Sequence, residues 1–228
     1  MASNNPQSQH DETAIDNLNT HLTSAGETLA SNKKYIFWGI GAVLAVGAFV
    51  IGYLCIFRNP RLNSSWEAYD KVEITALGND SVAAAEYSRV ADKYSSTDAG
   101  KIAALAAAEA LYNSGKYEEA IKYLNKFSSK DDVLEANAIV LLGDCYVNVK
   151  KYDDALNAFQ KAVRSANGNP QIVPRVLLKE AVIYDEQKKY DQALKCYEMI
   201  RTDFPQFTPG NGIQIDAYIE REKARLGK

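Results

Sequence analysis

The sequence predicts an all-α protein, an α-solenoid of paired helices carried on a single N-terminal transmembrane helix. Three observations predict this fold. A run of 23 uncharged, mostly apolar residues lies near the N-terminus, at residues 35–57. The chain beyond it is rich in Ala, Tyr and charged residues at helical spacing, with few strand signals. Within that region one pattern of small and bulky side chains recurs three times.

Composition argues against several classes of function. The chain has 228 residues and a formal net charge of −3, whereas nucleic-acid binding usually needs a basic patch. Both histidines, His10 and His21, precede the apolar run, so the rest of the chain has no imidazole for catalysis or metal binding. Cys55, Cys145 and Cys196 are too few and too widely spaced for a disulfide scaffold. We therefore predict no enzyme activity, cofactor, metal or small-molecule substrate.

Residues 1–34 are predicted to form a polar tail that ends in an amphipathic helix. Its apolar residues follow a 3-4-3-4 spacing, which places them on one helix face: Ile15, Leu18, Leu22, Ala25 and Leu29. This face would lie on a membrane surface or pack against a partner helix. The alternative is a weakly formed helix without a partner, because Gly26 and several Ser, Thr and Asn residues lower its helix propensity.

Residues 35–57 are predicted to be the transmembrane helix. At about 1.5 Å per residue the run spans roughly 34 Å, against about 30 Å for the hydrocarbon core of a bilayer. Lysines precede it and arginines follow it, and aromatic residues lie near both ends. A cleaved signal sequence is disfavoured, because the run is too long and no small-x-small site follows. Lipidation of Cys55 is disfavoured because Leu54, a bulky residue, precedes it.

One face of this helix carries only small residues. Gly41, Ala45, Ala48 and Gly52 recur at i, i+4, i+7 and i+11. Such strips let two helix backbones approach closely in lipid, so we identify these four residues as a candidate transmembrane helix contact. The alternative is that they reflect the general abundance of Gly and Ala in membrane helices.

The repeat lies within residues 58–228, the predicted solenoid domain. Three stretches align on a tyrosine that follows a turn, at positions 117, 152 and 190. They contain Ala107, Ala108, Leu111, Gly115, Tyr117, Ala120, Ile121, Leu124 and Phe127; Leu142, Gly143, Tyr146, Lys150, Tyr152, Ala155, Leu156, Phe159 and Ala162; and Glu180, Ala181, Tyr184, Lys188, Tyr190, Ala193, Leu194, Tyr197 and Ile200. These residues resemble the tetratricopeptide repeat, in which small side chains mark the crossing of two helices and bulky ones fill the space between them. The third stretch departs from the pattern at Glu180.

Two further segments complete the predicted stack. Residues 66–94 form a degenerate leading repeat, with Ala83, Tyr87 and Val90 in second-helix positions. Residues 213–226 form a capping helix with a polar outer surface. This capping helix would close the C-terminal end of the stack.

Repeat stacks of this kind bind proteins on a concave face built from the first helix of each pair. In register, that face presents three residues from each of three repeats as a candidate partner groove: Leu105, Glu109 and Tyr112; Val140, Asp144 and Val147; Leu178, Val182 and Asp185. Leu105, Val140 and Leu178 occupy positions where carboxylate-binding repeats carry cations. Glu109 and Asp144 would repel a carboxylate, so a receptor for C-terminal carboxylates is disfavoured. A mixed groove suits an extended or partly unfolded segment, or an amphipathic helix. The alternative is that some of these apolar residues only contact the capping helix.

The order of the segments resembles one family. A polar tail, one span and an Ala- and Tyr-rich repeat region, with the stretch Tyr94-Ser95-Ser96-Thr97-Asp98-Ala99-Gly100 before a helix of small residues, are similar to the YfgM-like bacterial inner-membrane proteins. The resemblance implies an ancillary subunit of the SecYEG translocon that works with a PpiD-like membrane-anchored chaperone on exported proteins. It also implies a single-pass inner-membrane protein with a cytoplasmic N-terminus and a periplasmic repeat domain. It carries over no functional residue.

Charge alone does not give the orientation. Lys33 and Lys34 lie before the span, while Arg58, Arg61 and Lys71 lie after it.

The alternative function is a general scaffold that assembles another membrane complex of the cell envelope through the same groove.

Overall fold

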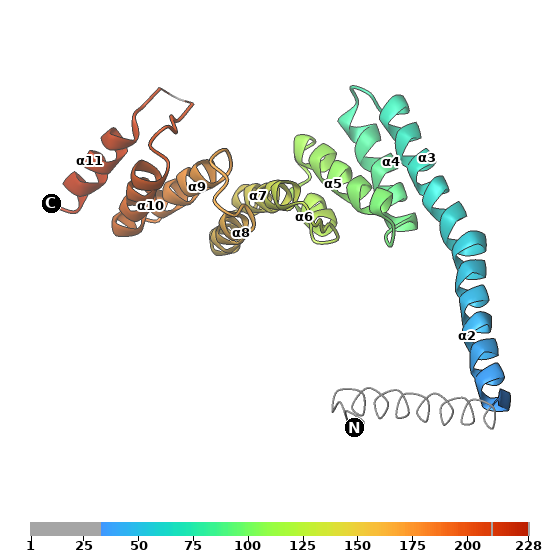
Figure 1. The fold of residues 1–228 in the computed structure, drawn as a ribbon. Helices are drawn as coiled ribbons and strands as arrows, with labels where there is room; N and C mark the ends of the chain where they lie inside the picture. Colours follow the sequence, from blue (N-terminus) through green and yellow to red (C-terminus); the bar gives the residue numbers. More distant parts are fainter. Residues whose placement is uncertain (1–32, 211, 228) are drawn as a thin grey trace, which may run out of the picture. The chain divides into compact units, whose positions relative to one another are not determined.

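The computed structural model describes residues 33–210 and 212–227, and every regular element among them is helical. The chain divides into two compact units, residues 1–60 and 61–228 (Figure 1). The first contains α2 (Lys33–Tyr53) and one turn of π-helix, η1 (Leu54–Arg58). The helix α3 (Asn59–Thr75) begins at its end and carries the chain into the second unit.

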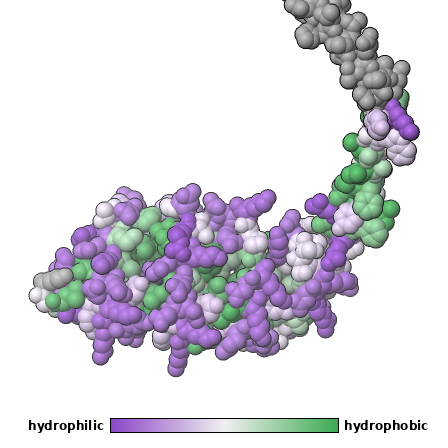
Figure 2. All heavy atoms as spheres, turned by 90° about the horizontal axis from the view of Figure 1, so that it is seen from below, coloured by the Kyte–Doolittle hydropathy of each residue, from purple (hydrophilic) through white to green (hydrophobic). Residues whose placement is uncertain are grey.

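The apolar helix of the first unit exposes bulky side chains on every side. Phe37, Trp38, Val43 and Phe49 are each more than two-thirds exposed. A helix that is apolar all round needs an apolar solvent. Among the described residues, one helix, Phe37–Thr75, contains a stretch long and apolar enough to cross a membrane. Figure 2 shows hydrophobic residues along this helix and a largely hydrophilic visible surface on the repeat unit.

Helical structure continues past the end of the predicted span instead of stopping near residue 57. Pro60 lacks an amide hydrogen, and its ring crowds the carbonyl group of Ile56 four residues earlier. The turn just before it is widened, and the Asn59 amide donates to the Leu54 carbonyl five residues back. This wide turn accommodates the proline inside a helix.

The second unit is a stack of antiparallel helix pairs. After α3 come α4 (Asp80–Lys93), α5 (Asp98–Asn113), α6 (Tyr117–Leu124), α7 (Asp132–Asn148), α8 (Tyr152–Ser165), α9 (Val173–Glu186), α10 (Tyr190–Asp203) and α11 (Ile215–Arg225). From α4 onward each helix packs on the next one along the chain. Three apolar clusters follow one another along the stack and form its core. The predicted α-solenoid fold is confirmed.

The recurring small and bulky residues of each second helix are buried, as the repeat pattern predicts. Ala120, Ala155 and Ala193 are fully buried, and so are Phe159 and Tyr197 one turn later. A methyl group at each crossing allows close approach of the helices, and the bulky residue fills the space beside it. The α5/α6, α7/α8 and α9/α10 pairs are the three repeats.

Both ends of the stack are formed by helices. The Tyr69 and Tyr87 rings, on α3 and α4, lie 5.3 Å apart at the N-terminal end. At the other end Tyr218 of α11 stacks on Tyr197 of α10, with ring centroids 5.0 Å apart. The inner face of α11 also carries Glu222, which is fully buried and accepts a 2.7 Å hydrogen bond from Arg221 Nε. The cap therefore has an ionic contact inside it as well as a polar outer surface.

The turn inside each repeat uses the same left-handed residue. Gly115, Lys150 and Lys188 have φ values of +75°, +61° and +58°, each two residues before the tyrosine that begins the second helix. This conformation brings the Cβ of a non-glycine residue too close to the backbone, at a cost of roughly 1–2 kcal/mol. Only the first repeat carries the glycine that removes this cost.

We predict that Lys150→Gly stabilises the protein by about 1 kcal/mol, because it relieves this strain. The matched control is Lys151→Gly, at the adjacent residue, whose φ is −91°. That variant should lose stability, because glycine there only adds freedom to the unfolded chain. Urea unfolding followed by circular dichroism measures both. A loss of stability in Lys150→Gly would contradict the strain argument.

Candidate functional site

The first helices of the three repeats, α5, α7 and α9, carry the nine predicted groove residues. Glu109 and Val182 are exposed; Tyr112, Val140, Asp144, Val147, Leu178 and Asp185 are half-buried. Leu105 differs from the prediction: it is buried in the core cluster that also contains Ala84 and Leu111. Position 105 is covered because α4 packs against α5. Leu105 is therefore a core residue that a partner cannot reach.

A salt bridge joins the second and third repeats across the predicted groove. Lys179 Nζ of α9 lies 2.6 and 2.8 Å from the two carboxylate oxygens of Asp144 on α7. The same ammonium group lies 6.0 Å from the centre of the buried Phe159 ring. The charge of Asp144 is thus largely neutralised inside the protein.

Asp185 is engaged by the capping helix. One of its carboxylate oxygens accepts a 2.8 Å hydrogen bond from Arg221, and the other accepts a bond from Arg225. Both arginines also contact the buried Glu222. Asp185 therefore holds α11 on α9, a contact with the capping helix that the sequence pattern did not predict for this acidic residue.

Glu109 is the third acidic residue of the predicted groove, and its carboxyl forms no ion pair within the described chain. Partial desolvation by its surroundings raises the pKa of its carboxyl. Nearby on α5, Tyr112 packs edge-on against Tyr117 of α6, with ring centroids 5.4 Å apart.

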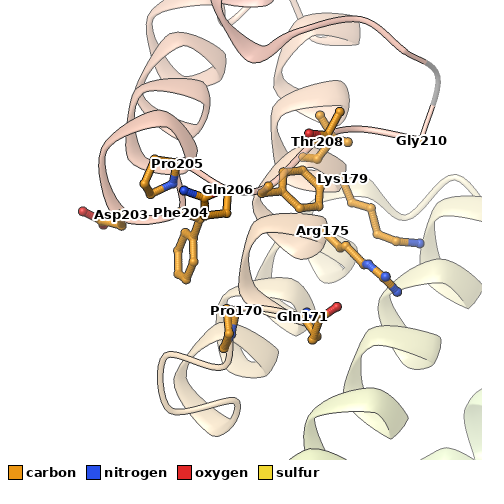
Figure 3. Close-up of a pocket in the computed structure, with 12 residues that line it drawn as sticks. Pro170, Gln171, Arg175, Lys179, Asp203, Phe204, Pro205, Gln206, Thr208 and Gly210 are labelled. Carbon is orange, nitrogen blue, oxygen red and sulfur yellow. The ribbon is translucent and has the colours of Figure 1, made fainter.

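A cavity of about 810 Å³ lies at the C-terminal end of this face. Its walls are formed by three parts of the chain: the α8–α9 loop, the exposed side of α9, and the connection from α10 to α11 (Figure 3). Leu178 is the predicted groove residue that lines it, together with Arg175 and Lys179 on the same helix. We call this cavity the C-terminal pocket.

The connection from α10 to α11 forms the wall that the sequence prediction missed. Asp203 at the end of α10 lines the pocket, as do residues 204–208 and 210 of the connection, including the half-buried rings of Phe204 and Phe207. The sequence pattern predicts only a break between helices here. A usable signal was the presence of two aromatic residues beside Pro205 and Pro209, because aromatic residues are uncommon in a fully solvated loop.

The predicted transmembrane contact strip lies on the surface of α2. Gly41, Ala45 and Ala48 are exposed and Gly52 is half-buried. A Cβ atom at Gly41 or Gly52 would have nothing within 4 Å. Within the described chain these residues are therefore open to another helix.

The buried cysteines are packing residues. Burial raises the pKa of the Cys145 and Cys196 thiols to about 12, so both stay protonated near neutral pH. Cys145 is completely buried in the core of the first two repeats. In the described residues no group of three or more His, Cys, Asp or Glu is placed to hold a metal ion.

Glu180 is a buried carboxyl in the third repeat. Its side chain is 5 % exposed, and its Oε1 atom has no hydrogen-bond partner among the described groups. Burial raises its pKa to about 7, with Arg164 opposing the shift. It occupies the position of Leu142 in the preceding repeat, which explains why the repeat pattern fails there.

We predict that Glu180 makes stability depend on pH. Its pKa is higher in the folded state than in the unfolded chain, so the folded state binds more protons. The contribution of Glu180 to stability is therefore fully present below about pH 4.5 and is lost as pH rises through 7, by about 3 kcal/mol. Glu180→Gln should remove this loss. Thermal unfolding of both proteins from pH 4.5 to 8 measures it, and parallel curves would contradict the prediction.

The comparisons with known proteins agree with the geometry. The family described as "Anaphase-promoting complex, cyclosome, subunit 3" matches residues 82–162, and the tetratricopeptide repeat family matches residues 175–206. A crystal structure of MamA protein is similar with a TM-score of 0.56 at 20% identity, covering 73% of this chain and 83% of that one. A second MamA crystal structure has a TM-score of 0.49 at 20% identity, covering 70% of this chain and 94% of that one. No curated protein matches.

The two family matches together fall on α4 to α8 and on α9 and α10, which are the helices of the three repeats and the helix before them. The likeness to MamA concerns the fold. The chain is therefore an all-α, tetratricopeptide-repeat-type solenoid that follows one apolar N-terminal helix.

Proposed function

We propose that this protein is a membrane-anchored interaction scaffold that assists protein export as an ancillary subunit of the Sec translocon. In this role it works with a PpiD-like membrane-anchored chaperone, to which exported proteins pass as they leave the translocon. The observation that carries the scaffold function is the solenoid face formed by α5, α7 and α9, which ends in the C-terminal pocket. The translocon as partner rests on the family resemblance of the segment order.

We further propose how the chain is arranged in the cell. Residues 1–34 are cytoplasmic, residues 35–57 cross the bacterial inner membrane, and residues 58–228 form the periplasmic repeat domain. The apolar exposed surface of α2 supports the span. The orientation follows the resemblance, because cations lie on both sides of the span.

The proposed partner surface differs in one respect from the groove inferred from the sequence. Glu109, Tyr112 and Val182 reach solvent, whereas the charges of Asp144 and Asp185 are paired within the protein. What remains open is mainly apolar and hydrogen-bonding surface, together with the carboxyl of Glu109, which is unpaired within the described residues. Such a surface suits an extended or partly unfolded segment, which gains affinity from apolar contacts along its length.

Gentle detergent extraction of the full chain, followed by mass spectrometry of the co-purifying proteins, tests this function. We expect translocon subunits and a membrane-anchored chaperone, lost when residues 62–228 are deleted. Val182→Glu, on the exposed face of α9, should reduce their recovery. Asn157→Glu is the matched control, because this residue is exposed on α8, the second helix of its repeat.

Recovery of a different stable complex would overturn the export role and support the general scaffold. Equal recovery with Val182→Glu and with Asn157→Glu would show that the partners do not use this face.

A further inference from the structure

The C-terminal pocket has an apolar floor and one basic edge. Phe204, Phe207 and Leu178 are half-buried, so each leaves part of its apolar surface on the pocket wall. Arg175 and Lys179, one helical turn apart on α9, carry the positive charge. In Figure 3 both of these side chains extend to one side of the pocket, and Asp203 lies on the other.

Of the two positive charges at this edge, one forms an ion pair within the described chain and the other does not. Lys179 is paired with Asp144 at 2.6 Å. Arg175 is exposed, and across residues 33–210 and 212–227 no carboxylate lies within ion-pair distance of its guanidinium group. Although the whole chain carries a net charge of −3, this edge presents an open guanidinium group beside apolar surface, and a guanidinium group binds a carboxylate through two parallel hydrogen bonds.

The aromatic wall of the pocket is held in place by local structure. The Phe207 amide donates a 2.9 Å hydrogen bond to the Phe204 carbonyl, which closes a tight turn. Pro205 lies within this turn, and Pro209, which follows it, is buried. Because two prolines and a hydrogen bond restrict this wall, a ligand loses little free energy in ordering it.

We propose that the C-terminal pocket docks an acidic segment of a partner protein, with an apolar side chain in the pocket and a side-chain carboxylate on Arg175. This inference rests on the proposed function as a partner-binding scaffold and names the chemistry of what is bound. The volume of about 810 Å³ admits an aromatic or branched side chain and lies within the usual range for binding pockets. Arg175 offers a planar pair of donors that matches a carboxylate.

Peptide selection on the full chain in lipid nanodiscs tests this proposal and does not require the partner to be identified first. A random 12-residue phage library is selected on the natural protein, on Arg175→Glu and on Arg89→Glu. Arg89 is the matched control, since it is an exposed arginine on α4, which does not line the pocket. We expect peptides with net negative charge and at least one large apolar residue from the natural protein and from the control.

The affinities of the selected peptides are then measured by fluorescence anisotropy. Arg175→Glu should weaken the strongest acidic peptide at least tenfold and should favour its analogue with Lys in place of Asp and Glu. Phe207→Ala should weaken both peptides, because it removes part of the apolar wall. The binding should also fall as salt rises.

Three results would overturn the proposal: no enrichment, neutral or basic enriched peptides, or equal affinity for the natural protein and Arg175→Glu. These outcomes are separable from a failure of the proposed function. If the natural protein co-purifies the translocon subunits but enriches no acidic peptide, the pocket proposal is wrong and the scaffold function stands. If peptides bind as expected and no partner co-purifies, the reverse holds.

Discussion

Gly100→Ala should destabilise the repeat unit by about 3 kcal/mol. Thr97 caps α5: its Oγ1 accepts a 3.1 Å hydrogen bond from the Gly100 amide and donates to the Tyr94 carbonyl at 2.8 Å. These two hydrogen bonds fold the chain so tightly that a Cβ at Gly100 would lie 1.9 Å from the Tyr94 carbonyl oxygen. Helix propensity alone predicts that alanine stabilises the helix by about 1 kcal/mol relative to glycine. The sign of the measured change therefore decides between the steric clash and helix propensity.

Thermal unfolding of the full chain in detergent, followed by circular dichroism, measures this change. A loss of about 3 kcal/mol corresponds to a fall in Tm of about 10 °C for a domain of this size. Lys101→Ala is the control, because the Lys101 side chain is half-buried and its ion-pair partner in the described chain is Asp98, at 3.8 Å. A gain in Tm for Gly100→Ala would show that the turn relaxes freely.

Gly143→Ala should cost about 2–3 kcal/mol for a different reason. Its Cβ would lie 2.3 Å from Cε1 of Phe159, whose ring is fully buried between the helices of the second repeat. The ring has no free space into which it can turn, because protein cores are close-packed. The overlap must therefore separate α7 from α8.

The compensating variant tests this explanation. Phe159→Leu shortens the side chain that meets the new methyl group, so the double variant Gly143→Ala/Phe159→Leu should be more stable than the two single changes added together. We expect a coupling energy of at least about 1 kcal/mol from equilibrium unfolding in urea. If the free energies of the two single changes simply add, the clash with the Phe159 ring is not the cause of the destabilisation by Gly143→Ala.

The site was only partly predictable from the sequence. The repeat register placed Glu109, Val182 and Leu178 on the first helices of their pairs, which is where they lie. It did not indicate that Leu105 is covered by its neighbouring helix, because exposure depends on how closely α4 approaches α5. It also gave no weight to Phe204 and Phe207, which lie outside the repeat pattern in a connecting loop.

The sequence by itself determined the local features of this protein. The apolar run, the helix pairs and their turns depend on contacts between residues close in sequence. The spacing of apolar and small residues along the chain therefore predicts them. The tertiary structure decided which charges remain open. Lys179 reaches Asp144 across 35 residues and Arg221 reaches Asp185 across 36, whereas Arg175 meets no carboxylate in the described chain. Those pairings depend on the rotation between successive repeats, because it sets which side chains of neighbouring helices come within reach.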